Sequence, residues 1–242
     1  MDMVGCLILH GYTGGPYEVA PLSSYLKKNT NWFIHVPTLP GHGRDLELED
    51  IPYTHWINAA EQALKTLKKQ YDEIHIIGFS MGGMIGAYLA AKYHIPKLVL
   101  LAPSGKYLSW KQLACDMGKL LADGVQNKLG KNKLFLQYKR KAGMIPFRSN
   151  IEFIRLVRFT RKYIRHVQSD VLIAQGYQDG MVPFKTAYYL YEKMVTPNKE
   201  VVFFDHSKHL ICLGEDKDTL NRLVHQFLLK KVPTATAMDT SF

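Results

Sequence analysis

The chain has 242 residues, of which 47% are hydrophobic, and it carries a formal net charge of +10 at pH 7. This length and apolar content suffice for one α/β domain with a sizeable core, and no apolar run reaches the roughly 18 residues that span a bilayer. The three cysteines (Cys6, Cys115 and Cys212) are too few and too widely spaced for a disulfide framework or a metal-ligand cluster.

Short apolar runs alternate with helical patterns along the first hundred residues. Strands are expected where aliphatic residues cluster, and helices where apolar residues recur every three or four positions. Pro16 can open the first helix, because the first helical turn leaves its N–H groups unbonded and proline has none. The expected order is strand 4–9, helix 16–28, strand 32–36, helix 53–70, strand 74–77, helix 81–93 and strand 97–101.

The alternation stops between residues 104 and 167, where the pattern is helical and basic. Residues 104–166 hold fifteen Lys and Arg against three Asp and Glu, whereas the rest of the chain holds sixteen against eighteen. Two interpretations stay open: a solvated set of lysine-rich helices, or an electropositive face that attracts an anionic partner such as a lipid surface, giving weak peripheral membrane contact. No nucleic-acid partner is expected, because no nucleic-acid motif accompanies the charges.

Regular alternation returns after residue 167. We expect strand 171–174, helix 183–194, strand 200–204, helix 216–231 and a disordered tail at 232–242. Strands that alternate with helices predict an α/β fold with a mainly parallel sheet of about six strands, covered by helices on both faces. The predicted core comprises 1–103 and 168–231, with 104–167 inserted as a small helical cap.

The chain begins without the basic region, apolar run and cleavage site of a secretion signal. A cytoplasmic protein is therefore expected. In that setting Cys6 and Cys212, which both lie in apolar surroundings, are expected to be reduced thiols of the core.

Ser80 follows the strand at 74–77 and precedes the helix at 81–93. The local sequence Gly78-Phe79-Ser80-Met81-Gly82 fits the G-x-S-x-G pattern, which is typical of a nucleophile elbow in this setting of strand, turn and helix. We expect a strained turn that lifts the serine hydroxyl above the sheet, with small residues on either side because neighbouring backbone approaches closely. The first N–H groups of the new helix, including that of Met81, would face a developing negative charge.

A nucleophilic serine needs a base, and the base needs an acid to orient it. Such groups should follow the carboxyl ends of parallel strands. Asp179 follows the strand at 171–174, although it could instead cap the next helix. His206 and His209 both follow the strand at 200–204. We favour His209 as the base, because it lies farther out in the loop and is followed by apolar residues that could anchor it.

The loop after the first strand is expected to supply the second oxyanion donor. Its sequence is His10-Gly11-Tyr12-Thr13-Gly14, and the backbone N–H of Tyr12 would lie beside that of Met81. His10 and His42 are expected to support these loops rather than take part in the chemistry.

Five motifs resemble the α/β-hydrolase superfamily, and more closely its small bacterial carboxylesterases and monoacylglycerol lipases. They are His10-Gly11-Tyr12-Thr13-Gly14, Pro40-Gly41-His42-Gly43, Gly78-Phe79-Ser80-Met81-Gly82-Gly83, Gly176-Tyr177-Gln178-Asp179 and Ser207-Lys208-His209. The resemblance covers nearly the whole chain. It implies the α/β-hydrolase fold and hydrolysis of a small, amphiphilic ester (an acyl ester of short to medium chain length, or a monoacylglycerol) without cofactor or metal.

The resemblance also implies roles for individual residues. It makes Ser80 the nucleophile, Asp179 the acid and His209 the base, and it assigns the oxyanion hole to the backbone N–H groups of Tyr12 and Met81. One position departs from the family pattern: Lys208 replaces the glycine that usually precedes the histidine. Its cation would either depress the pKa of His209 or point to solvent.

Other functions are compatible with the same residues. A lysophospholipase, a thioesterase, a carbon–carbon bond hydrolase or an acyltransferase could use the same triad, and the basic cap mildly favours anionic amphiphiles. A non-catalytic ligand-binding module is the alternative from another class, since fold does not dictate function. An acyl chain could be held by apolar residues of the cap, which could also simply pack on the core: Leu113, Met117, Leu120, Leu121, Ile145, Phe147, Ile151 and Ile154. The sequence predicts no oligomeric state.

Overall fold

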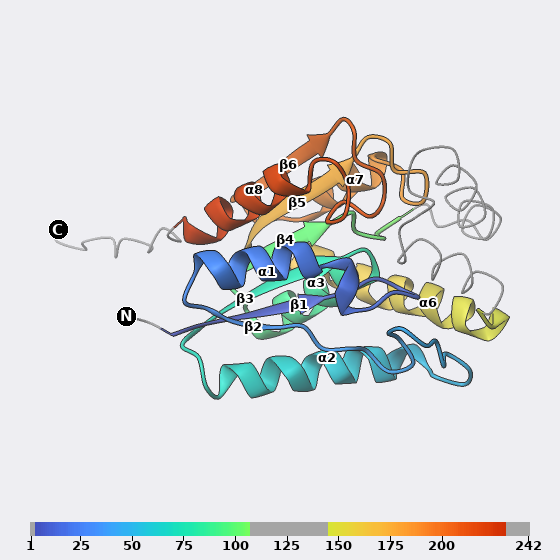
Figure 1. The fold of residues 1–242 in the computed structure, drawn as a ribbon. Coiled ribbons are helices and arrows are strands. Elements are labelled where there is room, and N and C mark those ends of the chain that lie inside the picture. The colour runs from blue at the N-terminus through green and yellow to red at the C-terminus, as the bar shows by residue number, and fades with distance from the viewer. Residues whose placement is uncertain (1–2, 107–144, 231–242) are drawn as a thin grey trace, which may run out of the picture.

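The computed structural model describes residues 3–106 and 145–230, and within them six parallel strands form one sheet in the order β2-β1-β3-β4-β5-β6. The strands are β1 (Val4–Leu9), β2 (Phe33–His35), β3 (Glu73–Phe79), β4 (Lys97–Leu101), β5 (Asp170–Gly176) and β6 (Lys199–Phe204). The predicted parallel sheet of six strands is confirmed (Figure 1).

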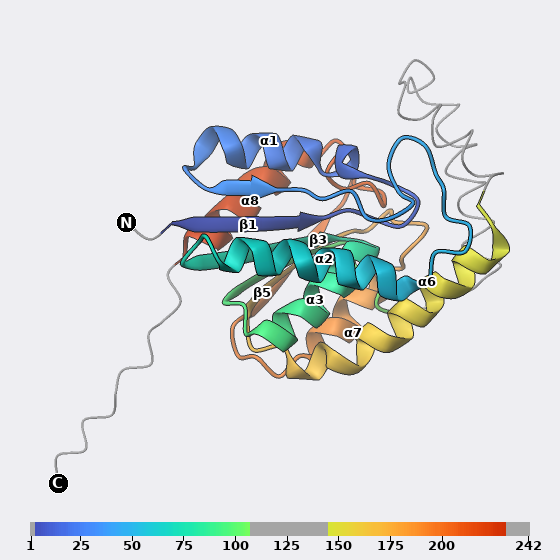
Figure 2. The same ribbon diagram turned by 90° about the horizontal axis from the view of Figure 1, so that it is seen from below.

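Helices cover both faces of the sheet, as Figure 2 shows. One face carries α1 (Ala20–Asn29) and α8 (Lys217–Leu229); the other carries α2 (Tyr53–Lys68), α3 (Met81–Tyr93), α6 (Phe147–Thr160) and α7 (Lys185–Lys193). Each face has its own apolar core. Cys6 and Cys212 are fully buried in the core beneath α1 and α8, which confirms their interpretation as core thiols.

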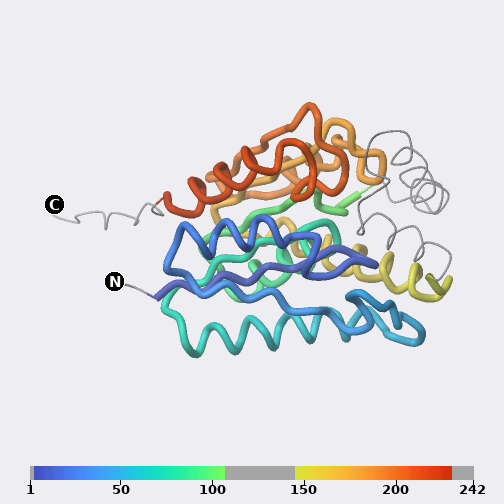
Figure 3. The backbone as a smooth tube through the Cα atoms, in the orientation of Figure 1, coloured from blue at the N-terminus to red at the C-terminus, as the bar shows by residue number. Residues whose placement is uncertain are grey.

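The sheet changes its direction of growth between β1 and β3. From β1 the chain adds β2 on one side, whereas β3 pairs with β1 on the other side and the later strands follow it outward. Leu9 pairs with Gly78, and Phe79 pairs with Leu101, so the carboxyl ends of these strands share one edge of the sheet. β1 begins and α8 ends at the opposite edge (Figure 3). Ligand sites of open α/β sheets lie at such a switch point, outside the carboxyl ends of the strands.

The helix predicted for residues 16–28 is interrupted in the structure. A short 3₁₀ helix, η1 (Pro16–Glu18), is followed by Val19 in a non-helical conformation, and α1 then begins at Ala20. Proline supplies the physical reason, since Pro21 cannot donate the N–H bond that a continuous helix would require there. In the first turn of α1 that bond is not needed.

Only residues 104–106 and 145–167 of the predicted cap are described. They include α6 and a 3₁₀ helix, η3 (Arg161–His166), which pack against α3. Apolar residues of these elements belong to the core on the α2 and α3 face of the sheet: Phe153, Leu156, Val157 and Ile164. The part of the predicted cap that is described thus packs on the core domain, while the division into core and cap stays a prediction.

The residues predicted to hold an acyl chain divide in the same way. Leu113, Met117, Leu120 and Leu121 lie outside the described residues, as do Cys115 and the predicted tail at 232–242. Phe147 is 70% exposed, and Ile145, Ile151 and Ile154 are half-buried. No helix within residues 3–106 and 145–230 is both long and apolar enough to cross a membrane.

Candidate active site

Ser80 lies on the sharp turn between β3 and α3. Its backbone has φ 52° and ψ −113°, a conformation that costs conformational energy for a residue with a Cβ and persists only where the surroundings impose it. Backbone hydrogen bonds of both its N–H and its carbonyl hold it in this conformation. The Ser80 N–H donates to the carbonyl of Leu101 at 2.8 Å, and the Ser80 carbonyl accepts from the N–H of Ser104 at 3.3 Å. The strained turn predicted from the sequence is confirmed.

Gly78 and Gly82 lie against neighbouring backbone on either side of this turn. A Cβ at Gly78 would lie 2.3 Å from the carbonyl oxygen of Gly82, and one at Gly82 would lie 2.4 Å from the carbonyl oxygen of Leu9. Both separations are below any that real Cβ atoms adopt. Gly78 therefore allows α3 to begin directly against the end of β3, and Gly82 allows it to lie against the end of β1, which brings the loop after β1 beside the elbow.

Replacing Gly82 with alanine is expected to destabilise the protein strongly. The new methyl group would meet backbone carbonyls of β1, which cannot turn aside as a flexible side chain would, so the cost should reach or exceed the roughly 1–3 kcal/mol of ordinary overpacking. Denaturant unfolding of the variant measures the change. Gly180→Ala is the matched control, because no atom lies within 4 Å of a Cβ at that position. Equal stability of the two variants would contradict the close approach.

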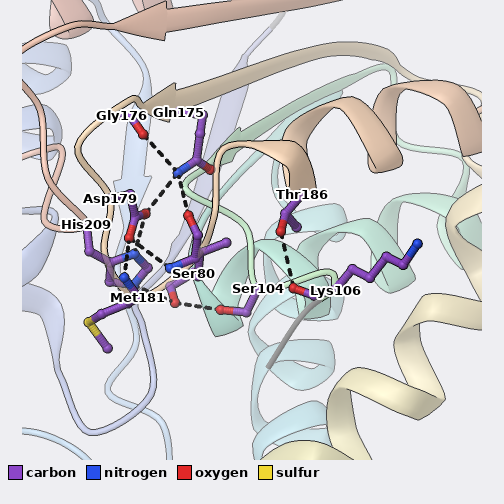
Figure 4. Close-up of polar contacts among 10 residues, drawn as sticks. Ser80, Ser104, Lys106, Gln175, Gly176, Asp179, Met181, Thr186 and His209 are labelled. Atoms are coloured by element: carbon purple, nitrogen blue, oxygen red, sulfur yellow. Dashed lines mark hydrogen bonds and ion pairs between the residues drawn. The ribbon is translucent and has the colours of Figure 1, made fainter. Parts of the chain in front are cut away.

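Ser80, His209 and Asp179 form a continuous series of hydrogen bonds (Figure 4). The Nε2 of His209 lies 3.0 Å from the Oγ of Ser80, and its Nδ1 lies 2.8 Å from Oδ2 of Asp179. Because a carboxylate only accepts, Nδ1 carries the proton and Nε2 is left to accept the serine O–H. All three side chains are nearly buried, with exposed fractions of 4–7%. The structure thus brings together the three residues predicted as nucleophile, base and acid.

Asp179 is held in place by four donors. Its Oδ1 accepts the backbone N–H groups of Met181 and Val182 at 2.9 and 2.8 Å, and its Oδ2 accepts the side-chain amide of Gln175 at 2.8 Å in addition to His209. The bonds to Met181 and Val182 are those of an aspartate in a tight turn. They do not cap the next helix, which was the alternative interpretation of this residue, because α7 begins at Lys185 after Phe184 and has no side-chain cap. One oxygen of Asp179 thus holds the turn and the other orients the histidine.

The environment of His209 raises its pKa above the ordinary value. Burial acts in the opposite direction and disfavours the cation, but the charge of Asp179, its hydrogen bond and the charge of Glu18 outweigh that effect. Lys208 is exposed, which agrees with the second of the two possibilities considered for it, that its cation points to solvent. His206, the competing candidate, is also exposed and lies outside the hydrogen-bonded series.

Two polar residues of the site were missed by the sequence analysis. The Oγ of Ser104 lies 2.8 Å from the Oγ of Ser80, and Gln175 bonds Asp179 as described above. Both are fully or almost fully buried. Ser104 follows β4, and Gln175 lies near the end of β5, so the rule that found Asp179 and His209 (polar residues at the carboxyl ends of strands) could have found them too.

Glu18 is a third residue that sequence reasoning missed. Its carboxylate, 3% exposed, accepts the N–H of Gly11 at 2.8 Å. A Cβ at Gly14 would fall 1.9 Å from one carboxylate oxygen, so the loop after β1 is folded closely around this side chain. No sequence signal indicated this, because the predicted continuous helix over 16–28 gave no reason to expect a buried acid at its start.

His10 fixes the geometry of the same loop. Its Nδ1–H donates to the carbonyl of Gly11 at 2.9 Å, and its Nε2 accepts the N–H of Leu39 at 3.0 Å. Since a trans peptide points its C=O and N–H in opposite directions, holding the Gly11 carbonyl also orients the N–H of Tyr12. His42, whose Nδ1–H donates to the carbonyl of Pro40 at 2.9 Å, likewise supports a loop. The expectation that both histidines are supporting residues agrees with these bonds.

The side chain of Tyr12 connects the loop to α6. Its ring stacks on Phe153 with 4.6 Å between the centroids and an angle of 6° between the planes, and its hydroxyl donates to Oδ1 of Asn150 at 3.1 Å. The backbone of Tyr12 is thereby anchored from two sides, by His10 within the loop and by α6 outside it.

Several solved structures share this fold. A metagenome-derived lipolytic enzyme, from work on the enzymes LipS and LipT, superimposes with a TM-score of 0.76 at 18% identity, over 94% of each chain. A monoacylglycerol lipase from Paleococcus ferrophilus superimposes with a TM-score of 0.71 at 16% identity, over 93% of each chain. At these identities the likeness establishes the fold alone.

Sequence comparison adds relatives that match along nearly the whole chain. A thermostable monoacylglycerol lipase from Bacillus sp. (strain H-257) is 26% identical over 234 residues, covering 94% of this chain and 91% of the relative. A carboxylesterase from Bacillus subtilis (strain 168) is 24% identical over 228 residues, covering 93% and 92%. The family model described as "alpha/beta hydrolase fold" matches residues 7–137. As this match spans more than half of the chain, and as the motifs predicted, the chain belongs to the alpha/beta hydrolase fold family.

Proposed function

We propose that this chain is a serine hydrolase that cleaves carboxylic esters through an acyl-enzyme intermediate. The observation that carries the proposal is the buried hydrogen-bonded series from Ser80 through His209 to Asp179 at the switch point of the sheet. The names of two relatives, a monoacylglycerol lipase and a carboxylesterase, support substrates that are acyl esters of short to medium chain length or monoacylglycerols.

Acylation begins with attack of the Ser80 Oγ on the ester carbonyl. His209 Nε2 accepts the hydroxyl proton as the bond to carbon forms. When the tetrahedral intermediate collapses, the same nitrogen gives that proton to the departing alcohol. A water molecule then takes the place of the alcohol, is deprotonated by His209 and releases the carboxylic acid from Ser80. Asp179 keeps Nδ1 protonated throughout and stabilises the imidazolium cation.

The negative charge on the former carbonyl oxygen is held by two backbone N–H groups, those of Tyr12 and Met81. Met81 begins α3, where the N–H groups have no acceptor within the helix. Support for Tyr12 comes from the contact of Gly82 with Leu9, which puts the loop after β1 beside the elbow, and from the bond of His10 that orients the peptide. Donors of this kind are each worth roughly 2.7–4 kcal/mol of transition-state stabilisation.

We further propose that residues 104–167 form a cap over the proposed active site. This cap is inserted between the core segments 1–103 and 168–231. Half-buried residues of its described part, Ile151 among them, are available to contact an acyl chain. The cytoplasmic location and the absence of a cofactor stay predictions from the sequence.

Hydrolysis of p-nitrophenyl esters from acetate to palmitate tests the proposed activity, together with monoacylglycerols of matching chain length. We expect saturable turnover with a chain-length optimum, and covalent labelling of Ser80 by a fluorophosphonate that substrate slows. If the chain preferred an acyl thioester or a lysophospholipid over every neutral ester, the proposed substrate class would be wrong, but the proposed triad would still hold. If Ser80 is labelled but the esters are not hydrolysed in water, and an added alcohol acceptor restores turnover, the chain is a transferase. If the chain showed neither labelling nor turnover, the non-catalytic ligand-binding module would be the remaining interpretation.

Glu18→Gln is expected to shift the acidic limb of the kcat/KM profile to lower pH. The charge of Glu18 raises the pKa of His209, so its removal lowers that pKa. The base works only when neutral, and activity is lost as pH falls through its pKa; a lower pKa therefore preserves activity further into the acid range. Glutamine can still accept the N–H of Gly11, so the rate on the alkaline plateau should change little.

The control for this shift is Glu49→Gln, which removes an exposed carboxylate. Its profile should overlay that of the wild type when kcat/KM is measured across the acidic and neutral range. A Glu18→Gln profile that moves to higher pH, or does not move, would contradict the assigned coupling between Glu18 and His209.

A further inference from the structure

A concave site lies on the α2 and α3 face of the sheet, and none of its lining residues belongs to the proposed triad. It is a pocket of about 650 Å³ between α6, η3 and α7, and Figure 2 shows these elements on that face. Most of its lining is cationic: Arg155, Arg158, Arg161, Lys162, Arg165 and Lys193. Within residues 3–106 and 145–230, no acidic side chain is among those that line it. Its volume is within the usual range for small-molecule sites.

The cations of this basic pocket recur at short helical spacing. Each of positions 155, 158, 161, 162 and 165 has another cation three or four residues away, which places like charges on one side of a continuous helical segment and destabilises it. A merely solvated surface normally mixes charges of both signs, which relieves such repulsion. Among the described residues, almost no acidic side chain offsets the repulsion between the cations of this pocket.

Only one lining cation has an acidic partner in the described part of the chain. Arg155 pairs with Oε1 of Glu152 at 2.6 Å, while the second oxygen of that carboxylate accepts the backbone N–H of Tyr53. The remaining five make no ion pair within residues 3–106 and 145–230. All five are exposed and free to turn toward a ligand.

The rest of the lining is aromatic or apolar. The rings of Tyr53 and Phe159 lie 5.9 Å apart, and Tyr189 contributes a third ring. Lys106 adds a further cation at this ring, with its Nζ 4.3 Å from the centroid. A guanidinium group presents a planar fork of N–H donors that matches two oxygens of a phosphate, and several of them around one hollow suit a group with more than one negative charge.

We propose that this basic pocket binds a phosphate-bearing anion with two or more negative charges. The proposal does not rest on the esterase function, because none of the lining residues belongs to the triad or to the oxyanion loop. The two sites share α6, however. Phe153 and Asn150 of this helix hold Tyr12, and Arg155 and Arg158 of the same helix line the pocket.

Titration of the full chain with inorganic tripolyphosphate, followed by isothermal calorimetry at low salt, tests the proposal. We expect saturable binding with one tripolyphosphate per chain. The double variant Arg158→Gln, Arg161→Gln should weaken it at least tenfold. The control, Lys27→Gln with Lys28→Gln, removes the same charge from exposed positions of α1 on the other face of the sheet and should leave the affinity unchanged.

Sedimentation with vesicles distinguishes a free phosphate compound from a lipid headgroup. Phosphatidylcholine vesicles are compared with vesicles that also contain phosphatidic acid. Tripolyphosphate binding without vesicle binding identifies a free ligand; vesicle binding that requires phosphatidic acid and is lost in the pocket variant identifies a headgroup, and should fall steeply with salt. Equal weakening in the pocket and control variants would show only diffuse attraction by the net charge. That result, or the absence of saturable binding to either probe, would overturn the proposal.

Discussion

Ser80→Ala is expected to reduce ester hydrolysis by about 10⁶-fold, close to the rate that binding and the oxyanion donors alone sustain. Alanine has no oxygen to attack the carbonyl, and in the described part of the chain no other hydroxyl is hydrogen-bonded to His209. Ser104 is a neighbouring candidate, but Nε2 of His209 accepts the hydrogen bond of the Ser80 hydroxyl and not one from Ser104. Since triad residues act as a unit, His209→Ala should cost a similar factor.

Initial rates on the best p-nitrophenyl ester, measured with enzyme high enough to detect residual turnover, provide the test. Ser24→Ala and His206→Ala are the controls, because each removes the same side chain from an exposed position. Both should retain the wild-type rate, and circular dichroism should show all four variants folded. If His206→Ala lost the rate and His209→Ala kept it, the general base would be His206 instead of His209. A rate kept in Ser80→Ala would exclude this serine as the nucleophile.

Asp179→Asn is expected to lower kcat by about 10⁴-fold, the loss found when a triad aspartate is made an amide. The reason lies in the four donors around this carboxylate. An asparagine has one acceptor oxygen and one NH₂ group, and the oxygen is retained by the N–H groups of Met181 and Val182. The NH₂ group then faces Nδ1 of His209, which must lose its proton to accept. The proton moves to Nε2, and a protonated Nε2 cannot take the proton of Ser80.

Measurement of kcat and KM separates this effect from a loss of binding, since KM should change far less than kcat. Asp205→Asn is the matched control: Asp205 is exposed and lies in the loop before His209. Its kcat should equal that of the wild type. Equal losses in the two variants would indicate a general effect of charge rather than the tautomer of His209. An unchanged kcat in Asp179→Asn would exclude the orienting role.

The sequence predicted the elements that depend on local pattern. Short runs rich in aliphatic and aromatic residues predicted all six strands, and the glycines around Ser80 predicted the strained turn, because both signals lie within a few residues. The proximity of Ser80, Asp179 and His209 was predictable because parallel strands bring their carboxyl ends to one edge whatever separates them along the chain. The choice between His206 and His209 depended on their positions in the loop and on the apolar residues that follow His209, and their burial now distinguishes them.

What the sequence did not reveal depends on tertiary contacts. Glu18 is buried because the loop after β1 folds back over it, and an isolated acid in a helical pattern gives no sign of that contact. The break at Val19 was readable from Pro21, but the helical pattern outweighed it in the prediction. In the sequence, Gln175 resembles any other polar residue near the end of a strand. Only its hydrogen bond to Asp179 in the folded chain distinguishes it. In the described part of the basic segment, packing on α3 and the convergence of charge with α7 likewise required the fold.

The distribution of the proposed triad over three strand ends has a consequence for folding kinetics. Ser80 and His209 are 129 residues apart in sequence, and β4, β5 and β6 must all pair before their side chains can meet. Non-local pairings of this kind form late, because the chain entropy of closing long loops is lost before the contacts are gained. Helical signal should therefore recover before activity when the unfolded chain is returned to native conditions. Ester turnover then reports the docking of the last strand, and a partly folded chain with an incomplete sheet is catalytically silent.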